Sequence, residues 1–140
     1  MNKILLIAGI LNATAAILHI GCIYFGAAWY RFFGAGEQMA LMAEKGSLQP
    51  TIITSGIVIV LSIWASYAFA AAADVKLPYM RPVLIVITSI YLIRAVVGGV
   101  LALMDIELGR SVDFWFWSSA ISLIFASAHL LGLKQVWSRL

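Results

Sequence analysis

A single arginine stands in the middle of an apolar segment of this chain. The stretch SIYLIRAVVGGVLAL, residues 89–103, surrounds Arg94 with aliphatic side chains. A guanidinium at the centre of a membrane-spanning helix costs about 2.5–3.5 kcal/mol on insertion scales, so other groups must compensate for it. Two interpretations stay open. Either neighbouring helices satisfy the charge as part of packing, or Arg94 contacts an anion or a strong acceptor: a lipid phosphate, a carboxylate or a quinone carbonyl.

Four further polar side chains in apolar segments are candidates for the same site. Asn12 and His19 are seven residues apart and share one helix face, Tyr91 precedes Arg94 by three residues, and His129 lies near the C-terminus. At ~1.5 Å rise per residue, Asn12 and His129 fall about 10–12 Å from one membrane edge, and Arg94 and His19 about 18 and 22 Å. The spacing predicts a polar seam inside a helix bundle, with Arg94 as the ligand contact and His19 and Tyr91 as its neighbours.

The composition indicates an integral membrane protein. Hydrophobic residues make up 64% of the chain and charged residues 11%, with a mean hydropathy of +1.03, whereas soluble domains are about half apolar and a quarter charged. Because one span needs roughly 20 apolar residues, the 140 residues predict one domain, residues 1–140, that is an all-α transmembrane four-helix bundle. The predicted spans are residues 4–25, 50–73, 82–104 and 114–136. Small and hydroxyl residues at helical spacing in these spans predict close helix packing.

The distribution of lysine and arginine predicts the orientation. The N-terminus, the second loop and the C-terminus together carry five basic residues and one acidic residue, whereas the first and third loops carry three basic and five acidic residues. Cytoplasmic loops are enriched in lysine and arginine. We therefore expect a multi-pass protein of the bacterial inner membrane with both termini cytoplasmic, whose N-terminal apolar run is a retained anchor rather than a cleaved signal peptide.

The first outer loop is the only long one, and it begins with aromatic residues suited to the lipid headgroup layer. Its next stretch, GAGEQMALMAEKG, places Met39, Met42 and Ala43 on one helical face and Glu37 and Glu44 on another. This pattern predicts a short interfacial helix. The alternative is a mobile linker.

Several kinds of chemistry are disfavoured. The single cysteine, Cys22, permits no internal disulfide or redox pair. The depths of His19 and His129 differ by about 12 Å, too much for two axial ligands of one haem, and His19 with Cys22 is too small a set for a metal site. No acidic residue lies inside a span, no serine has the neighbours of a nucleophile, and the net charge of +3 is too scattered for nucleic acid.

The segments HIGCIYFGAAWYRFFGAGEQMA, YLIRAVVGG and FWFWSSAISLIFASAHLLG resemble a group of small, uncharacterised bacterial four-helix inner-membrane proteins, along most of the chain. In size and helix count the chain is also loosely similar to the DoxX-type family, some members of which are linked to quinol oxidases. The second resemblance has no specific motif, so it implies no role for any residue here.

These observations favour a small, non-enzymatic binding or accessory protein of the membrane. Its polar seam, formed by Asn12, His19, Tyr91, Arg94 and His129, would accommodate a lipid-like or quinone-like molecule or a partner's helix. No cofactor is expected beyond a quinone or a bound lipid, and the expected partners are membrane lipids, another membrane protein or a second copy of the chain. The alternative function is a redox component linked to quinones, or a transport component.

Overall fold

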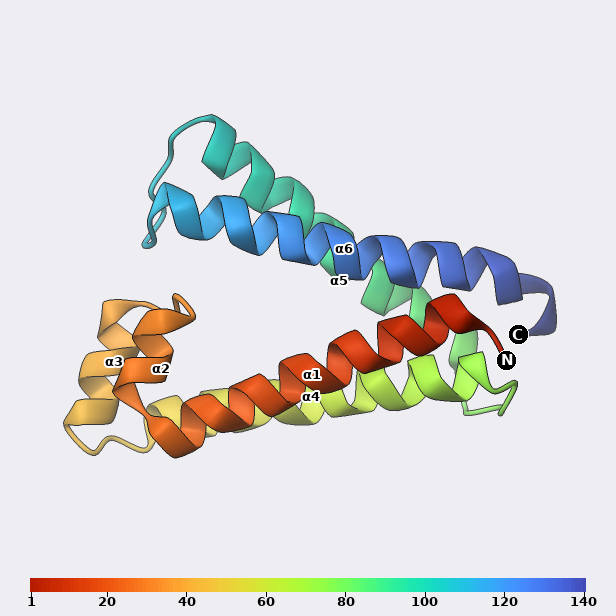
Figure 1. Ribbon diagram of the computed structural model, residues 1–140, viewed down its shortest axis with the longest axis horizontal. Helices are drawn as coiled ribbons and strands as arrows, with labels where there is room; N and C mark the ends of the chain where they lie inside the picture. The colour runs from red at the N-terminus through yellow and green to blue at the C-terminus, as the bar shows by residue number, and fades with distance from the viewer. The chain divides into compact units, whose positions relative to one another are not determined.

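The computed structural model describes all 140 residues and contains helices only. In chain order these are α1 (Lys3–Phe25), α2 (Ala27–Phe32), α3 (Glu37–Glu44), α4 (Gln49–Ala72), α5 (Met80–Leu103), α6 (Val112–Val136) and the 3-10 helix η1 (Trp137–Arg139) (Figure 1). Four of them, α1, α4, α5 and α6, are long and apolar enough to cross a membrane. The predicted spans agree with these helices to within two residues at every end, so the predicted all-α, four-helix transmembrane class is confirmed.

Local sequence explains where the long helices begin. The Ser111 side chain caps α6 by accepting a hydrogen bond from the Phe114 backbone N–H at 3.2 Å. Asp113 in the first turn and Lys134 in the last turn have the charges that the helix dipole favours. Pro50 and Pro82 lie in the first turns of α4 and α5, where a missing N–H costs no helical hydrogen bond.

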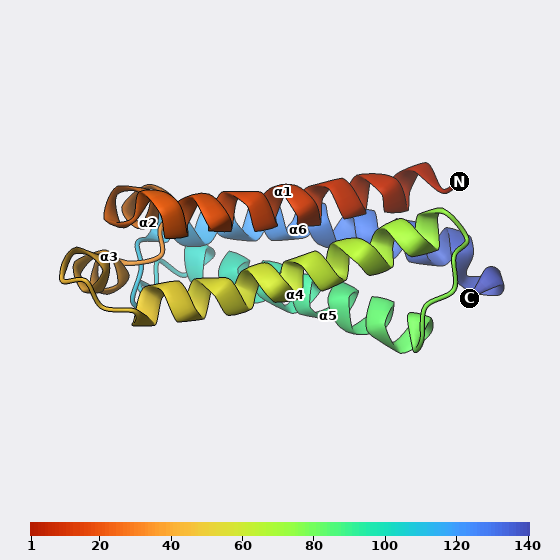
Figure 2. The same ribbon diagram turned by 90° about the horizontal axis from the view of Figure 1, so that it is seen from below.

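The first of two compact units comprises residues 1–12 and 63–140. It contains the start of α1, the end of α4, and all of α5, α6 and η1; α5 lies beside α6 in Figures 1 and 2. Leu5, Leu84, Ile87 and Val136 are at most 1% exposed and form the centre of its core. Gly132 lets α1 approach α6, because a Cβ atom there would lie 2.6 Å from Cγ of Leu5.

Polar contacts close the end of this unit that carries both termini. The Asn2 backbone N–H donates to the Ala72 carbonyl at 2.8 Å, and the Asn2 side chain donates to Oε1 of Gln135 at 2.7 Å. Arg139 forms an ion pair with Asp74 at 2.7 Å. The first helix is therefore tied both to the end of α4 and to the end of α6.

The second unit, residues 13–62, contains the rest of α1 and α4 together with α2 and α3. Tyr30 is only 3% exposed, and its hydroxyl donates to the Pro50 carbonyl at 3.3 Å and shares a hydrogen bond of 3.0 Å with Oγ1 of Thr54. Tyr30, Cys22 and Ala40 form a small core. The helix predicted around GAGEQMALMAEKG is confirmed as α3, whereas α2, in the aromatic stretch before it, was not predicted.

An exposed ion cluster joins α2 to α3. The Arg31 guanidinium contacts Glu37 at 2.7 Å and Glu44 at 2.5 Å, so the two glutamates predicted to share a face bind the same cation. Arg31 lowers the pKa of Glu37 below its ordinary value, chiefly through the hydrogen bonds that it donates to the carboxylate. The same pairing raises the pKa of Arg31.

Candidate functional site: a buried polar cluster and an exposed arginine

Three of the five predicted site residues meet inside the first unit. Asn12 comes from α1, Tyr91 from α5 and His129 from α6. The Tyr91 hydroxyl donates to Oδ1 of Asn12 at 2.5 Å, and Nδ2 of Asn12 lies 2.8 Å from Nε2 of His129. The predicted equal depth of Asn12 and His129 is therefore confirmed, and one chain of hydrogen bonds links three spans.

The hydrogen bonds define the protonation state of the His129 ring. An amide nitrogen can only donate, so Nε2 of His129 must accept from Asn12, and in the neutral ring the proton lies on Nδ1. This Nδ1 has no hydrogen-bond partner, although His129 is only 1% exposed. Most buried polar groups in proteins are paired. The cluster therefore retains one unused donor.

Aromatic side chains enclose this cluster. The Tyr91 ring stacks on His129 with ring centroids 5.6 Å apart, and it meets Trp64 of α4 at 5.4 Å and Phe125 of α6 at 5.1 Å. Because these rings are apolar on their faces, they exclude water from the hydrogen bonds beside them. Trp64 and Phe125 were not predicted as parts of the site, and their sequence positions carry no signal beyond ordinary core aromatics.

Arg94 lies outside the buried cluster. Its side chain is exposed, and its hydrogen bond within the protein is from Nη2 to Oγ of Ser118 on α6, at 3.2 Å. The prediction that Arg94 lies inside the seam is thus wrong, because the Arg94 side chain is exposed while the Tyr91 hydroxyl donates inward to Asn12. Tyr91, Ala95 and Gly98 form the buried face of α5, and helix geometry turns Arg94 about 60° away from Tyr91.

The buried face of α5 packs closely on α6 beside Arg94. The Ser119 hydroxyl donates to the Ala95 carbonyl, and a Cβ atom on Gly98 would lie 3.2 Å from Cβ of Ser119. The packing predicted from small residues is therefore confirmed for α5 and α6. It also fixes the rotation of α5, so the Arg94 side chain is held at the edge of the interface between the two helices.

His19 belongs to the second unit and bonds to its own helix. Its Nδ1 lies 2.6 Å from the Ala15 carbonyl, one turn earlier. Its ligand-binding role stays a prediction. No group of three or more histidine, cysteine, aspartate or glutamate side chains in the chain is arranged to hold a metal ion.

Comparison with known proteins gives no match to this chain among family models, curated proteins or solved structures. The geometry of the site therefore carries the functional argument.

Proposed function

We propose that this small integral membrane protein is a non-enzymatic binding protein, and that Arg94 contacts the acceptor oxygen of a lipid-like or quinone-like molecule within the membrane. The observation that carries the proposal is that most N–H donors of the Arg94 guanidinium have no partner within the protein. This guanidinium is exposed and has one hydrogen bond within the protein, to Ser118. A guanidinium has five N–H donors, so four are free for a ligand.

The position of Arg94 along α5 supports a ligand from the membrane. Arg94 is 14 residues after Met80, the first residue of a 24-residue helix, and therefore about 21 Å along a helix of about 36 Å. Hydrocarbon offers no hydrogen-bond acceptor at that depth, and ionisable groups within spans are functional candidates for this reason. A carbonyl, carboxylate or phosphate oxygen would satisfy the free donors.

The buried cluster positions this contact. Tyr91, one turn before Arg94, is held by Asn12, and Asn12 is held by His129. These bonds fix the rotation of α5 and with it the direction of Arg94. His129 is only 1% exposed, so its role in this proposal is to hold Asn12 and not to contact the ligand.

The proposal extends to the cellular setting. We place the protein in a bacterial inner membrane with both termini in the cytoplasm, because the basic residues concentrate in the terminal segments and the second loop. The loose similarity in size and helix count to the DoxX-type family, some members of which are linked to quinol oxidases, is compatible with a quinone-like ligand.

Native mass spectrometry of gently extracted protein tests this function. The wild-type protein should retain a small lipid-like or quinone-like molecule, and Arg94→Leu should lose it. Ser118→Ala is the matched control, because it removes the protein's partner of Arg94 and leaves the guanidinium, so it should keep the ligand. Removal of an exposed charge from a span should also favour membrane insertion of Arg94→Leu, by up to about 2.5–3.5 kcal/mol.

Two results would contradict the proposal. Equal retention of the ligand by Arg94→Leu would show that Arg94 is not the contact. A lower free energy of unfolding for ligand-free Arg94→Leu than for ligand-free wild type would show that Arg94 has a structural role. A second protein retained in place of a small molecule would instead favour an accessory subunit that pairs Arg94 with a partner's helix, and a co-purified quinone that changes redox state would favour the redox alternative.

A further inference from the structure

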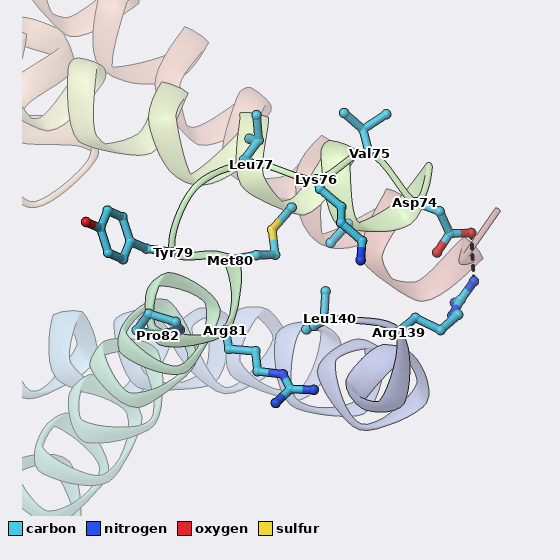
Figure 3. A pocket seen from close by; sticks show the side chains of 11 residues that line it. Asp74, Val75, Lys76, Leu77, Tyr79, Met80, Arg81, Pro82, Arg139 and Leu140 are labelled. Carbon is cyan, nitrogen blue, oxygen red and sulfur yellow. Dashed lines mark hydrogen bonds and ion pairs between the residues drawn. The ribbon is translucent and has the colours of Figure 1, made fainter.

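A second site lies at the end of the first unit that carries the termini. The loop between α4 and α5 and the last residues of the chain line a half-open cavity of about 510 Å³ (Figure 3). This volume is within the range of small-ligand pockets in proteins. Its walls include the apolar side chains of Leu77, Met80 and Leu140. None of these residues belongs to the polar cluster or to the surroundings of Arg94.

The lining of this cavity is basic. Lys76, Arg81 and Arg139 contribute three positive side chains and Asp74 one negative side chain. Asp74 is already neutralised by Arg139 at 2.7 Å. Two cations, Lys76 and Arg81, therefore have no acidic side chain as a partner in the cavity. Figure 3 shows Lys76 extending from the loop toward Leu140.

The two unpaired cations keep most of their donors free. Lys76 has no hydrogen-bond or ion-pair partner in the protein. Arg81 donates one hydrogen bond, from Nη2 to the Trp137 carbonyl at 3.3 Å, and its guanidinium lies over the Trp137 ring at 5.1 Å. This stacking orients the fork of the guanidinium while leaving its other N–H groups available for an anion.

The start of α5 adds to the positive potential. Met80, the first residue of α5, lines the cavity, and the residue before it, Tyr79, provides no side-chain cap. Backbone N–H groups in the first turn of a helix are unsatisfied and favour anions. The N-terminus of α5 and the two cations thus all favour an anion in the cavity.

Aromatic side chains place the cavity at the level of lipid headgroups. Tyr79 is 78% exposed and Trp137 is 45% exposed, and both lie at the ends of apolar membrane-spanning helices. Tyrosine and tryptophan are enriched at the boundary between membrane and water. Basic pockets between spans at this level are suited to the phosphate groups of anionic lipids.

We propose that this cavity binds the phosphodiester headgroup of an anionic phospholipid, with Lys76 and Arg81 as its phosphate contacts and Leu77 and Met80 against its glycerol and upper acyl carbons. The site is independent of Arg94. It would fix one lipid against the loop between α4 and α5.

Native mass spectrometry tests the proposal with two lipids of the same acyl chains, phosphatidylglycerol and the zwitterionic phosphatidylcholine. The full chain is used after removal of any affinity tag. Wild-type protein should retain phosphatidylglycerol in preference to phosphatidylcholine. At about fivefold in affinity per cation near the membrane surface, Lys76→Gln should weaken binding about fivefold and the double variant K76Q/R81Q about 25-fold.

Matched variants distinguish lipid binding at this cavity from general electrostatic attraction of the lipid to basic residues. K3Q/K134Q removes two exposed lysines at the same end that do not line the cavity, so it should bind phosphatidylglycerol like wild type. Lys76→Arg keeps the charge of Lys76 and leaves Arg81 on Trp137, so it should bind phosphatidylglycerol as well as wild type. Lys76→Gln carries the test if K76Q/R81Q fails to fold, because Lys76 has no partner within the protein. Arg94→Leu should also bind it normally, which separates this site from the proposed function.

Four outcomes would overturn the proposal. They are equal retention of the two lipids by wild type, unchanged affinity in Lys76→Gln, equal losses in K76Q/R81Q and K3Q/K134Q, and displacement of phosphatidylglycerol by millimolar inorganic phosphate. The last outcome would assign the cavity to a soluble phosphate compound instead of a lipid.

Discussion

Asn12 and His129 are joined by a hydrogen bond of 2.8 Å although 117 positions separate them in the chain. The same amide accepts the Tyr91 hydroxyl, so one asparagine side chain links α1, α5 and α6. Both polar ends of the amide are used, and neither faces the hydrocarbon. Asn12 is therefore the central residue of the first unit's polar interior.

Replacement of Asn12 by leucine should lower the free energy of unfolding by about 1–3 kcal/mol. The change removes two hydrogen bonds and leaves the Tyr91 hydroxyl and the His129 ring without partners, and hydrogen bonds between spans average about 0.6 kcal/mol with a maximum of about 1.7. Reversible unfolding in mixed detergent micelles measures the loss. Tyr91→Phe removes only one hydrogen bond, so it should lower the free energy of unfolding by less. If Asn12→Leu lowered it no more than Tyr91→Phe does, the bond to His129 would contribute nothing to stability.

Replacement of glycine by alanine at two positions in the membrane spans should have opposite effects on stability. Gly132→Ala places a Cβ atom 2.6 Å from Cγ of Leu5 and 3.2 Å from its backbone nitrogen, and such overpacking costs about 1–3 kcal/mol. Gly56→Ala meets no atom within 4 Å, so the higher helix propensity of alanine should leave stability equal or raise it by up to about 1 kcal/mol. The same unfolding assay compares them, and similar effects of both changes would refute the packing of α1 on α6.

The contact between α2 and α3 should depend on pH. The pKa of Glu37 lies below its ordinary value of 4.5 because Arg31 binds the carboxylate. The stabilisation is therefore fully present above pH 4.5 and is lost as the pH falls through the lower pKa of the folded protein. Carboxyl NMR of Glu37 measures the titration. Arg31→Gln should return the pKa of Glu37 toward 4.5, whereas Lys45→Gln, which removes the other cation of the same unit, should leave it unchanged. An ordinary pKa in wild type would contradict the ion pair.

Labelling of single cysteines should reveal the orientation in the membrane. In a Cys22→Ser background, Ser47→Cys in the first long loop should react with a membrane-impermeant maleimide on intact cells. Ser138→Cys, near the C-terminus, should react only after permeabilisation. Both serines are exposed in the structure, so access depends on the side of the membrane. The reverse labelling pattern would invert the topology that the basic residues predict.

The spans and the level of the polar residues were predictable because they follow from simple periodicities. Runs of apolar residues of bilayer length define the helices, and a constant rise per residue places Asn12 and His129 at one depth. The structure adds that their side chains meet. The surface of α3 was predictable for the same reason, since Glu37 and Glu44 lie two helical turns apart.

The direction of each side chain around its helix was harder to predict. Arg94 and Tyr91 are close enough in sequence to share a face, and the choice between burying one or the other depends on α6, where Ser119 packs against Gly98. This contact turns Tyr91 inward and Arg94 outward. The cavity beside Lys76 could not be predicted from the sequence either, because it forms only where the loop after α4 meets the C-terminal residues.

The 117 positions between Asn12 and His129 also imply a delay between the synthesis of the two residues. Ribosomes add about 5–20 residues per second, so the amide of Asn12 is made roughly 6–23 seconds before the imidazole that will bind it. Tyr91 is made earlier and donates to Oδ1 of the amide, but until His129 is made the amide N–H group of Asn12 lacks its acceptor. The insertion machinery, water or lipid headgroups must solvate this amide until the last helix emerges, and synthesis of that helix is what completes the fold of the first.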